Sequence, residues 1–262
     1  HNNLWIKRED KSTVFYGGNK LRKFEFIYGK ILQTGKKIVA TAGGIGTNHG
    51  LAAVFVGNKF GLKTRLYLFP QPLTWHVQRS LLLYHHLGAK IRFVKGVYRL
   101  ILRLLGVRLF KRKYYLMLIG ASPLLGIGTS LGTLGFVNAI FELKAQIDAG
   151  EMPEPDYIFV PCGSSGTAGG LIAGCKIVGL KTKVRPVRVA DAIVINTKNI
   201  ARTANKVIKL IRKYDMSVPD ITIKENDFDL ETDYYGTNYG VKTRRGQAAV
   251  DKVNELEGKL KD

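Results

Sequence analysis

The sequence is poor in acidic residues, and none at all occurs between Glu25 and Glu142. The chain has 41 lysines and arginines against 20 aspartates and glutamates, so its formal net charge is +21. A surplus of this size attracts polyanions in a salt-dependent way, which makes nucleic acid a candidate partner. No nucleic-acid module with interleaved aromatic residues accompanies the charge, so we expect no nucleic-acid partner.

Cysteine is also scarce. Cys162 and Cys175 form no C-x-x-C pair and no ligand cluster with the five histidines, so we expect neither a disulfide framework nor a metal site. No apolar run reaches the roughly 18 to 20 residues that span a bilayer, and no signal-peptide pattern is present. We therefore expect a soluble, cytoplasmic protein that does not contact membranes.

What the sequence does contain is typical of a globular protein. Apolar residues make up 45% and charged residues 23% of the chain, which is close to the average of globular proteins. Its length of 262 residues is enough for one large domain or two moderate ones. Short β-rich runs alternate with longer helical patterns, which predicts an α/β protein with parallel sheets covered by helices on both faces. Strands are expected at 4–7, 37–40, 64–69, 90–94, 114–118, 157–162 and 184–189. Helices are expected at 21–32, 48–60, 76–88, 131–146, 167–178, 195–214 and 244–256.

The most basic stretch is residues 97–113, "VYRLILRLLGVRLFKRK". Its leucines and arginines resemble a basic amphipathic helix, which suggests an interaction surface. An ordinary helix with a solvated basic face explains the same pattern. Both interpretations stay open, because charge alone says little about function.

Three expected strand-to-helix loops are rich in glycine, hydroxyl and amide groups, and ligands of open α/β sheets bind in such loops. In "CGSSGTAGGL", residues 162–171, glycines and a helix N-terminus suit a phosphate, and Ser164, Ser165 and Thr167 add hydroxyl donors. The loop matches neither the Walker pattern nor G-x-G-x-x-G. Plain turn and capping chemistry would explain it equally well.

The other two loops carry amide, imidazole and amine groups. In "TAGGIGTNHG", Thr47 or Asn48 can cap the next helix, or Asn48 and His49 can hydrogen-bond a ring substituent or a carboxylate. The segment "FYGGNKLRKFE" brings Lys20 to the first turn of a helix. There the positive end of the helix dipole lowers the pKa of the amine, and a neutral amine can attack an aldehyde. The alternative for Lys20 is a solvated lysine after a Gly-Gly turn.

Four segments together carry a resemblance to a known family: "IKRED…GGNKLRKFEF", "GGIGTNHG", "SLGTLGFVNA" and "GSSGTAGGL". In this order and spacing they resemble the pyridoxal-phosphate enzymes of the 1-aminocyclopropane-1-carboxylate deaminase and D-cysteine desulfhydrase family. The resemblance covers residues 4 to about 258. It implies fold type II, with two open, twisted, mostly parallel sheets flanked by helices. Residues 1–33 and 137–262 would form the cofactor-binding large domain and residues 34–136 the small domain, and the protein would be a homodimer.

The resemblance also implies roles for individual residues. Lys20 would form the Schiff base with the cofactor aldehyde, and Lys23 would lie near the cofactor phosphate. Asn48 would hydrogen-bond the phenolic oxygen of pyridoxal phosphate, while Thr47 replaces a usual serine beside the substrate carboxylate. Tyr239 matches the first of two tyrosines that cover the substrate. The implied phosphate cup consists of Gly163, Ser164, Ser165, Gly166 and Thr167.

The implied activity is that of a pyridoxal-phosphate-dependent lyase or deaminase acting on a small amino acid. A D-cysteine desulfhydrase would release sulfide, ammonia and pyruvate, whereas a cyclopropane-carboxylate deaminase would release 2-oxobutyrate and ammonia. The tripeptide "TNH" at residues 47–49 is closer to the S-N-H of the desulfhydrases than to the S-N-Q of the deaminases. The alternative is a catalytically inactive relative that binds a partner or a polyanion through its basic surface.

The sequence departs from the family pattern in two places. Gly46 stands where the family often has glutamine, and nothing in the final "LEGKLKD" matches the D-P-V-Y-[TE]-G-K and H-T-G-G motifs that follow in the family. Those motifs hold the second tyrosine and the residue facing the pyridine nitrogen, which tunes the electron sink. We therefore expect the usual C-terminal segment to be missing, either because the sequence is part of a longer enzyme or because it is a shortened, inactive relative.

Overall fold

The computed structural model describes residues 4–13, 17–110, 112–121, 130–237 and 241–258. The chain divides into two compact units, His1–Gly135 and Phe136–Asp262. The first unit includes the helix Lys20–Gln33. The expectation that residues 1–33 belong to one domain with residues 137–262 stays a prediction.

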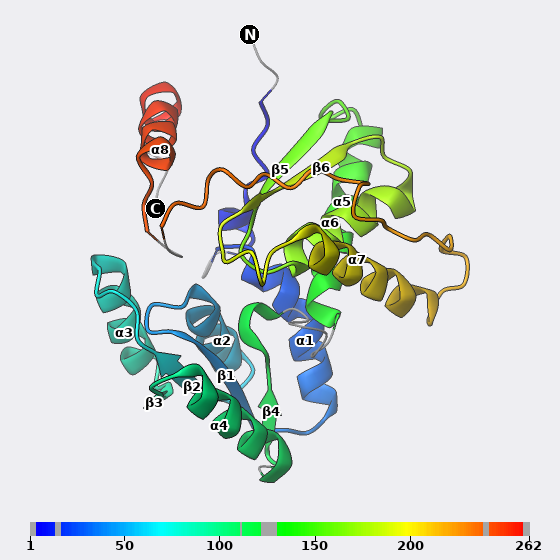
Figure 1. The fold of residues 1–262 in the computed structure, drawn as a ribbon. Coiled ribbons are helices and arrows are strands. Elements are labelled where there is room, and N and C mark those ends of the chain that lie inside the picture. Colours follow the sequence, from blue (N-terminus) through cyan, green and yellow to red (C-terminus); the bar gives the residue numbers. More distant parts are fainter. Residues whose placement is uncertain (1–3, 14–16, 111, 122–129, 238–240, 259–262) are drawn as a thin grey trace. The chain divides into compact units, whose positions relative to one another are not determined.

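A four-stranded parallel sheet forms the centre of the first unit, with strand order β3-β2-β1-β4 (Figure 1). Its strands are β1 (Ile38–Gly44), β2 (Lys63–Phe69), β3 (Lys90–Phe93) and β4 (Tyr114–Leu116). Its helices are η1 (Glu9–Lys11), α1 (Lys20–Gln33), α2 (Asn48–Lys59), α3 (Trp75–His86), α4 (Val97–Phe110) and η2 (Ile119–Ala121).

The strand order reverses next to β1. The chain runs outward from β1 to β2 and β3, and α4 then returns it to β4 on the other side of β1. Ligands of open α/β sheets bind beyond the carboxyl ends of the strands at such a reversal. Because β1 ends at Gly44, the glycine-rich segment before α2 starts at this point.

The two faces of this sheet have separate cores. Val39 packs with apolar residues of α1 and α2, whereas Ala40 and Ala42 pack with residues of α4. The alternation follows from the strand geometry, which points successive side chains to opposite faces. Because both faces are covered, β1 is apolar or small along its whole length.

The second unit is built around two parallel strands, β5 (Tyr157–Cys162) and β6 (Lys183–Arg188). Helix α6 (Gly166–Val178) connects them, and its first ten residues are all buried. A side chain at Gly174 would lie 2.7 Å from Ile140, so glycine permits the close approach of α6 to α5. The remaining helices that end in this unit are α5 (Leu131–Asp148), α7 (Thr197–Arg212) and α8 (Arg244–Glu257).

The α/β class with two parallel sheets is confirmed, and each expected helix has a counterpart whose ends differ by a few residues. The predicted strand at residues 4–7 is wrong, because this segment has no regular structure. Leu4, Trp5 and Ile6 are 79%, 51% and 55% exposed. A strand needs a neighbour for its backbone hydrogen bonds, and the described part of the chain provides none here.

Candidate active site

The sequence-predicted residues lie in two groups. Lys20, Lys23, Thr47 and Asn48 belong to the first unit, and the turn Gly163–Thr167 belongs to the second. Tyr239 lies outside the described residues.

The Gly-Gly turn before Lys20 has a backbone reason. A side chain at Gly17 would meet the carbonyl oxygen of Asp10 at 1.9 Å, and Gly18 has φ = +121°, which favours glycine. The amide of Gly18 also donates to the carbonyl oxygen of Glu9. The two glycines therefore let the chain fold back on η1 and start α1 at Lys20.

An ion pair fixes this arrangement. The Nε of Arg22, in the first turn of α1, lies 2.7 Å from a carboxylate oxygen of Glu9 in η1, and both side chains are largely shielded from water. An arginine that pairs with a carboxylate at short range holds its geometry well. The pair therefore ties the segment before α1 to the helix that presents Lys20.

The amine of Lys20 is partly buried, and its Nζ donates to the Oδ1 of Asn19 at 3.1 Å. Loss of hydration lowers the pKa of Lys20 to about 8. The direction agrees with the sequence-based expectation, and the cause found in the structure is burial. At pH 7 roughly one amine in ten is then neutral and nucleophilic, far more than for an ordinary lysine.

Lys23 is fully buried, with no exposed surface. Lysines are almost never fully buried unless their charge is compensated by a partner. Lys20 and Lys23 are three residues apart on α1, so they lie on the same side of the helix. The first turn of α1 thus carries two lysines withdrawn from water.

His49 in α2 faces the same lysines. Its ring lies against Phe24 of α1, with centroids 5.4 Å apart and planes inclined by 70°. Burial, together with the charges of Lys20 and Lys23, lowers the pKa of His49 to about 3. His49 is therefore neutral at physiological pH. It was named from sequence as one possible hydrogen-bonding residue, and its burial beside the lysines appears only in the tertiary structure.

Thr47 confirms one of the two sequence interpretations of its loop. Its Oγ1 accepts a hydrogen bond from the amide of Gly50, so it caps α2. Its carbonyl oxygen accepts a hydrogen bond from the hydroxyl of Tyr84 at 2.8 Å. A side chain at Gly43 would lie 2.7 Å from Thr47, so the end of β1 and the cap fit closely together. Asn48, the next residue, is exposed.

Gly46 departs from the family pattern, and the structure shows what fills its surroundings. The amide of Gly46 donates to the Oε1 of Gln71 at 3.2 Å. A side chain at Gly46 would lie 2.7 Å from Val77. The side-chain amide of Gln71 thus lies against Gly46, and the sequence analysis did not identify this residue.

The turn between β5 and α6 holds the second group. Ser165 stands at the position that precedes α6, but its side chain makes no capping hydrogen bond. Ser165 and Thr167 are only 6% and 4% exposed, and their hydroxyls form no hydrogen bond with another described residue. The first amides of a helix also lack partners within the helix. Unused hydroxyls and amides at a helix N-terminus fit a phosphate group.

A second buried hydroxyl site was missed by the sequence analysis. Thr133, in the "SLGTLGFVNA" segment, has no exposed surface, and its Oγ1 has no hydrogen-bond partner among the described residues. It lies between Gly132 and Gly135, where side chains would collide with Ala121 and with Arg22. Two glycines three residues apart in the sequence could have indicated that α5 packs closely on another element at this point.

The described ranges offer neither a metal site nor a membrane-spanning helix. They contain no group of three or more histidine, cysteine, aspartate or glutamate side chains that could hold a metal ion. None of their helices is long and apolar enough to cross a membrane.

Comparisons with known proteins identify the family and the fold of the chain. The model of the family "Pyridoxal-phosphate dependent enzyme" matches residues 1–260. A Thermotoga maritima protein assigned by name to the 1-aminocyclopropane-1-carboxylate deaminases is 30% identical over 99% of this chain and 79% of its own length. The D-cysteine desulfhydrase of Klebsiella pneumoniae is 28% identical over 99% of this chain and 76% of its own length.

Solved structures show the same fold. The crystal structure of an ACC deaminase homologue matches with a TM-score of 0.78 and 25% identity, over 98% of this chain and 74% of that one. The hydrogen sulfide-producing enzyme of Fusobacterium nucleatum matches with a TM-score of 0.58 over 87% of this chain and 65% of that one, at 14% identity. The architecture is that of a fold type II enzyme, and the chain covers about three quarters of its two sequence relatives. The chain therefore belongs to the pyridoxal-phosphate-dependent enzymes, in the family of 1-aminocyclopropane-1-carboxylate deaminase and D-cysteine desulfhydrase.

Proposed function

We propose that this protein is a pyridoxal-phosphate-dependent lyase or deaminase of a small amino acid, with Lys20 as the residue that holds the cofactor. The observation that carries the proposal is the lowered pKa of Lys20, about 8, in the first turn of α1. An amine that joins an aldehyde must be neutral when it attacks. Lys30, the exposed lysine of the same helix, has no such burial.

Other residues have the chemical groups that would bind the rest of the cofactor. The buried hydroxyls of Ser165 and Thr167, with the backbone amides of residues 163–167, suit the cofactor phosphate. Lys23 would add a positive charge near that phosphate, and Asn48 would hydrogen-bond the phenolic oxygen. These assignments rest on the family resemblance and on the burial and hydrogen bonding described above.

Bound pyridoxal phosphate supplies an electron sink for the carbanion at the substrate Cα. The chain's own residues then manage protons and orientation. Lys20 would move the proton at the substrate Cα, and a pKa near 8 suits this role at neutral pH. His49 stays neutral and adds no positive charge beside Lys20 and Lys23. Thr47 orients the substrate carboxylate, and Tyr239 covers the substrate.

We place the substrate on the D-cysteine side of the family, because residues 47–49 read T-N-H. The products would be sulfide, ammonia and pyruvate. Opening of 1-aminocyclopropane-1-carboxylate to 2-oxobutyrate and ammonia is the second candidate within the same family. A cytoplasmic homodimer is the expected form of the enzyme.

The test uses the full chain mixed with pyridoxal phosphate. We expect a yellow absorbance band that borohydride removes, and peptide mass spectrometry should then find the cofactor on Lys20. Lys20→Ala should lose both signals, whereas Lys30→Ala, on the exposed side of α1, should keep them. A colourless protein, or cofactor attached at another lysine, would refute the proposal.

Activity is measured separately, as sulfide release from D-cysteine and 2-oxobutyrate release from the cyclopropane amino acid. Sulfide release supports the proposed substrate, and 2-oxobutyrate release alone would replace it with the second candidate. Cofactor attachment without turnover of either substrate would favour the inactive relative.

A further inference from the structure

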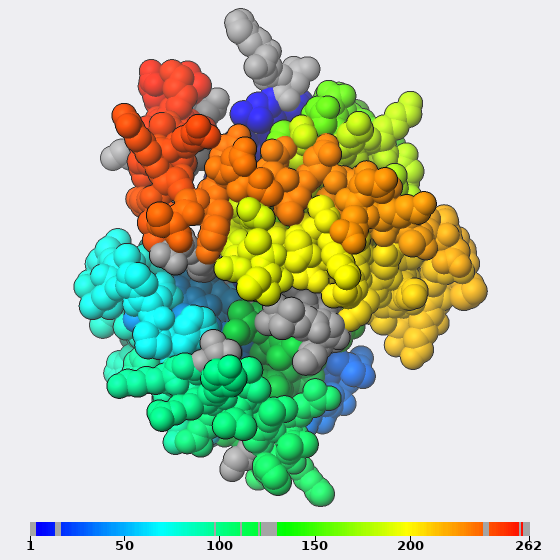
Figure 2. Space-filling model, viewed as in Figure 1, coloured from blue at the N-terminus to red at the C-terminus, as the bar shows by residue number. Residues whose placement is uncertain are grey.

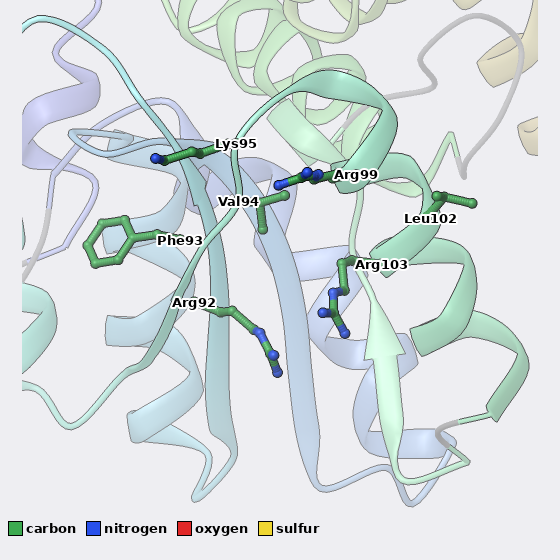
Figure 3. A pocket seen from close by; sticks show the side chains of 7 residues that line it. All are labelled: Arg92, Phe93, Val94, Lys95, Arg99, Leu102 and Arg103. Atoms are coloured by element: carbon green, nitrogen blue, oxygen red, sulfur yellow. The ribbon is translucent and has the colours of Figure 1, made fainter.

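The first unit carries an open cavity of about 820 Å³ between the edge strand β3 and helix α4 (Figure 3). Four basic residues line it: Arg92, Lys95, Arg99 and Arg103. Phe93 and Leu102 contribute apolar surface. Its lining residues are different from the candidate active-site residues of the first unit, which lie on α1 and at the start of α2.

The sheet and the helix place these charges together. Arg92 pairs in register with Tyr67 of β2, whose side chain belongs to the core under α4, so both lie on the α4 face of the sheet. Helix α4 packs on that core through Leu100 and Val107 and leaves the edge strand β3 uncovered. Arg92 from the strand and Arg103 from the helix extend into the same space (Figure 3).

The charges in this cavity are not neutralised. None of the four basic side chains forms an ion pair with any residue that the structure describes. The first unit has 22 lysines and arginines but only three carboxylates, whereas the second has 19 and 17. Nearly the whole positive surplus of the chain therefore lies in the first unit. Several uncompensated positive groups around one concave space attract an anion strongly.

Helix α4 also has an exposed apolar side. Tyr98, Leu102 and Leu109 are 85%, 68% and 68% exposed. In the space-filling view the green residues of this segment lie on an outer surface of the first unit (Figure 2). The basic residues 99 and 103 flank this apolar side, so the cavity combines cationic and apolar surface.

The chemistry of the lining points to phosphate. One guanidinium group can donate two parallel hydrogen bonds to the oxygens of a phosphate, and three of the four basic residues are arginines. The volume lies in the range of cavities that hold small organic ligands, roughly 300 to 1,000 Å³. We propose that this cavity binds a small organic ligand that carries two or more phosphate groups.

The test is calorimetric titration of the full chain with inorganic pyrophosphate at low salt, in the presence of saturating pyridoxal phosphate. We expect saturable binding of one pyrophosphate per chain. Arg92→Gln and Arg103→Gln should each weaken binding at least about fivefold, in line with the loss of a charge-assisted hydrogen bond. Arg79→Gln, an exposed arginine on α3 of the same unit, should leave binding unchanged.

Three outcomes would overturn the proposal: no saturable binding, equal weakening by Arg79→Gln, or displacement of pyrophosphate by pyridoxal phosphate, seen as binding that occurs only when pyridoxal phosphate is left out. Equal weakening would show a diffuse charge effect, and displacement would place the ion at the cofactor site. Lys20→Ala should bind pyrophosphate normally, so failure of the proposed enzymatic function leaves this test intact.

Two further arms identify the source of the phosphate. In the first, the chain is mixed with phosphatidylcholine vesicles that contain phosphatidylinositol bisphosphate. Binding that pyrophosphate reverses would support the proposed site, with a lipid headgroup as its ligand. The opposite result is a chain that does not bind pyrophosphate but does bind vesicles or single-stranded DNA. If pyrophosphate does not compete with that binding and Arg92→Gln does not weaken it, the proposed cavity site is contradicted and an extended basic surface is favoured.

Discussion

The Nε2 of His49 lies 2.8 Å from the Oγ1 of Thr41, and this buried hydrogen bond joins the first turn of α2 to strand β1. The other ring nitrogen, Nδ1, is buried and has no hydrogen-bond partner among the described residues. Because the ring also contacts Phe24 of α1, His49 connects the strand to the two helices that carry the candidate residues.

His49 should make the protein sensitive to acid. Its pKa is about 3 in the folded protein against 6.5 in the unfolded chain. The unfolded chain therefore binds an extra proton between these values, so stability falls as the pH drops from 6.5 to 3. In His49→Gln this fall should be shallower, by up to about 1.4 kcal/mol per pH unit.

The measurement is the free energy of unfolding of the cofactor-free protein by denaturant at several pH values. His49→Gln should also be less stable than the parent near pH 7, because it loses its packing on Phe24. His86→Gln, which changes an exposed histidine of α3, should keep the slope of the parent. A parental slope in His49→Gln would contradict the prediction.

The charge of Lys20 should destabilise the folded protein, so stability should rise when this amine loses its proton. Its pKa is about 8 in the folded protein and 10.5 in the unfolded chain. Below pH 8 both states are protonated and the folded state bears the cost of a poorly hydrated charge. As the pH rises from 8 to 10.5 this cost disappears and stability increases.

Lys20→Met should therefore be more stable than the parent at pH 7, by about 1–2 kcal/mol without cofactor. The difference should narrow as the pH approaches 10.5, and denaturant unfolding at pH 7, 9 and 10.5 measures it. Lys30→Met on the exposed side of α1 serves as the control. A constant difference at all three pH values would show that packing, not titration, causes the effect.

Gly135 should tolerate no side chain. A Cβ there would lie 1.9 Å from the carbonyl oxygen of Arg22, a backbone atom of α1. We expect Gly135→Ala to lower the free energy of unfolding by about 2–4 kcal/mol, because backbone cannot move aside cheaply. Gly29→Ala on α1, where nothing lies within 4 Å, should instead raise it by about 0.5–1 kcal/mol.

Both glycine variants are compared by denaturant midpoints and by cofactor binding. Since Gly135 contacts the helix that presents Lys20, its variant should also bind pyridoxal phosphate more weakly than Gly29→Ala does. Equal stability of the two variants would mean that the approach of α5 to α1 is looser than described.

Ser165 should matter for the cofactor and not for folding. It precedes α6 without a capping hydrogen bond, so Ser165→Ala should change stability by less than about 0.5 kcal/mol. Affinity for pyridoxal phosphate should fall roughly tenfold through loss of a hydrogen bond to a charged group. Absorbance titration with the cofactor gives this affinity.

Asn196 is the matched comparison, because its side chain does cap a helix by accepting a hydrogen bond from the amide of Asn199. Asn196→Ala should lower stability by about 1 kcal/mol and leave cofactor affinity unchanged. If the two variants behaved in the reverse way, Ser165 would be a helix cap and not a phosphate ligand.

Local patterns predicted the helices and strands because each depends on neighbouring residues. The 3.6-residue and two-residue periodicities fix which side of an element is apolar, and glycines such as Gly61, Gly88 and Gly179 mark ends with positive φ. Residues 4–7 show the limit of this reasoning. Their β-branched and aromatic character suggested a strand, but a strand also requires a partner that local sequence does not specify.

By itself the sequence determined the α/β class, the positions of the glycine-rich turns and, through the resemblance, Lys20 as the candidate for the cofactor. Only the tertiary structure decided that Lys23 and His49 are buried beside it, that Gln71 reaches Gly46, and that Arg92 and Arg103 line one cavity. The physical reason is that burial, pKa and ion pairing depend on residues distant in the chain. Their effects arise when packing removes water and brings charges together.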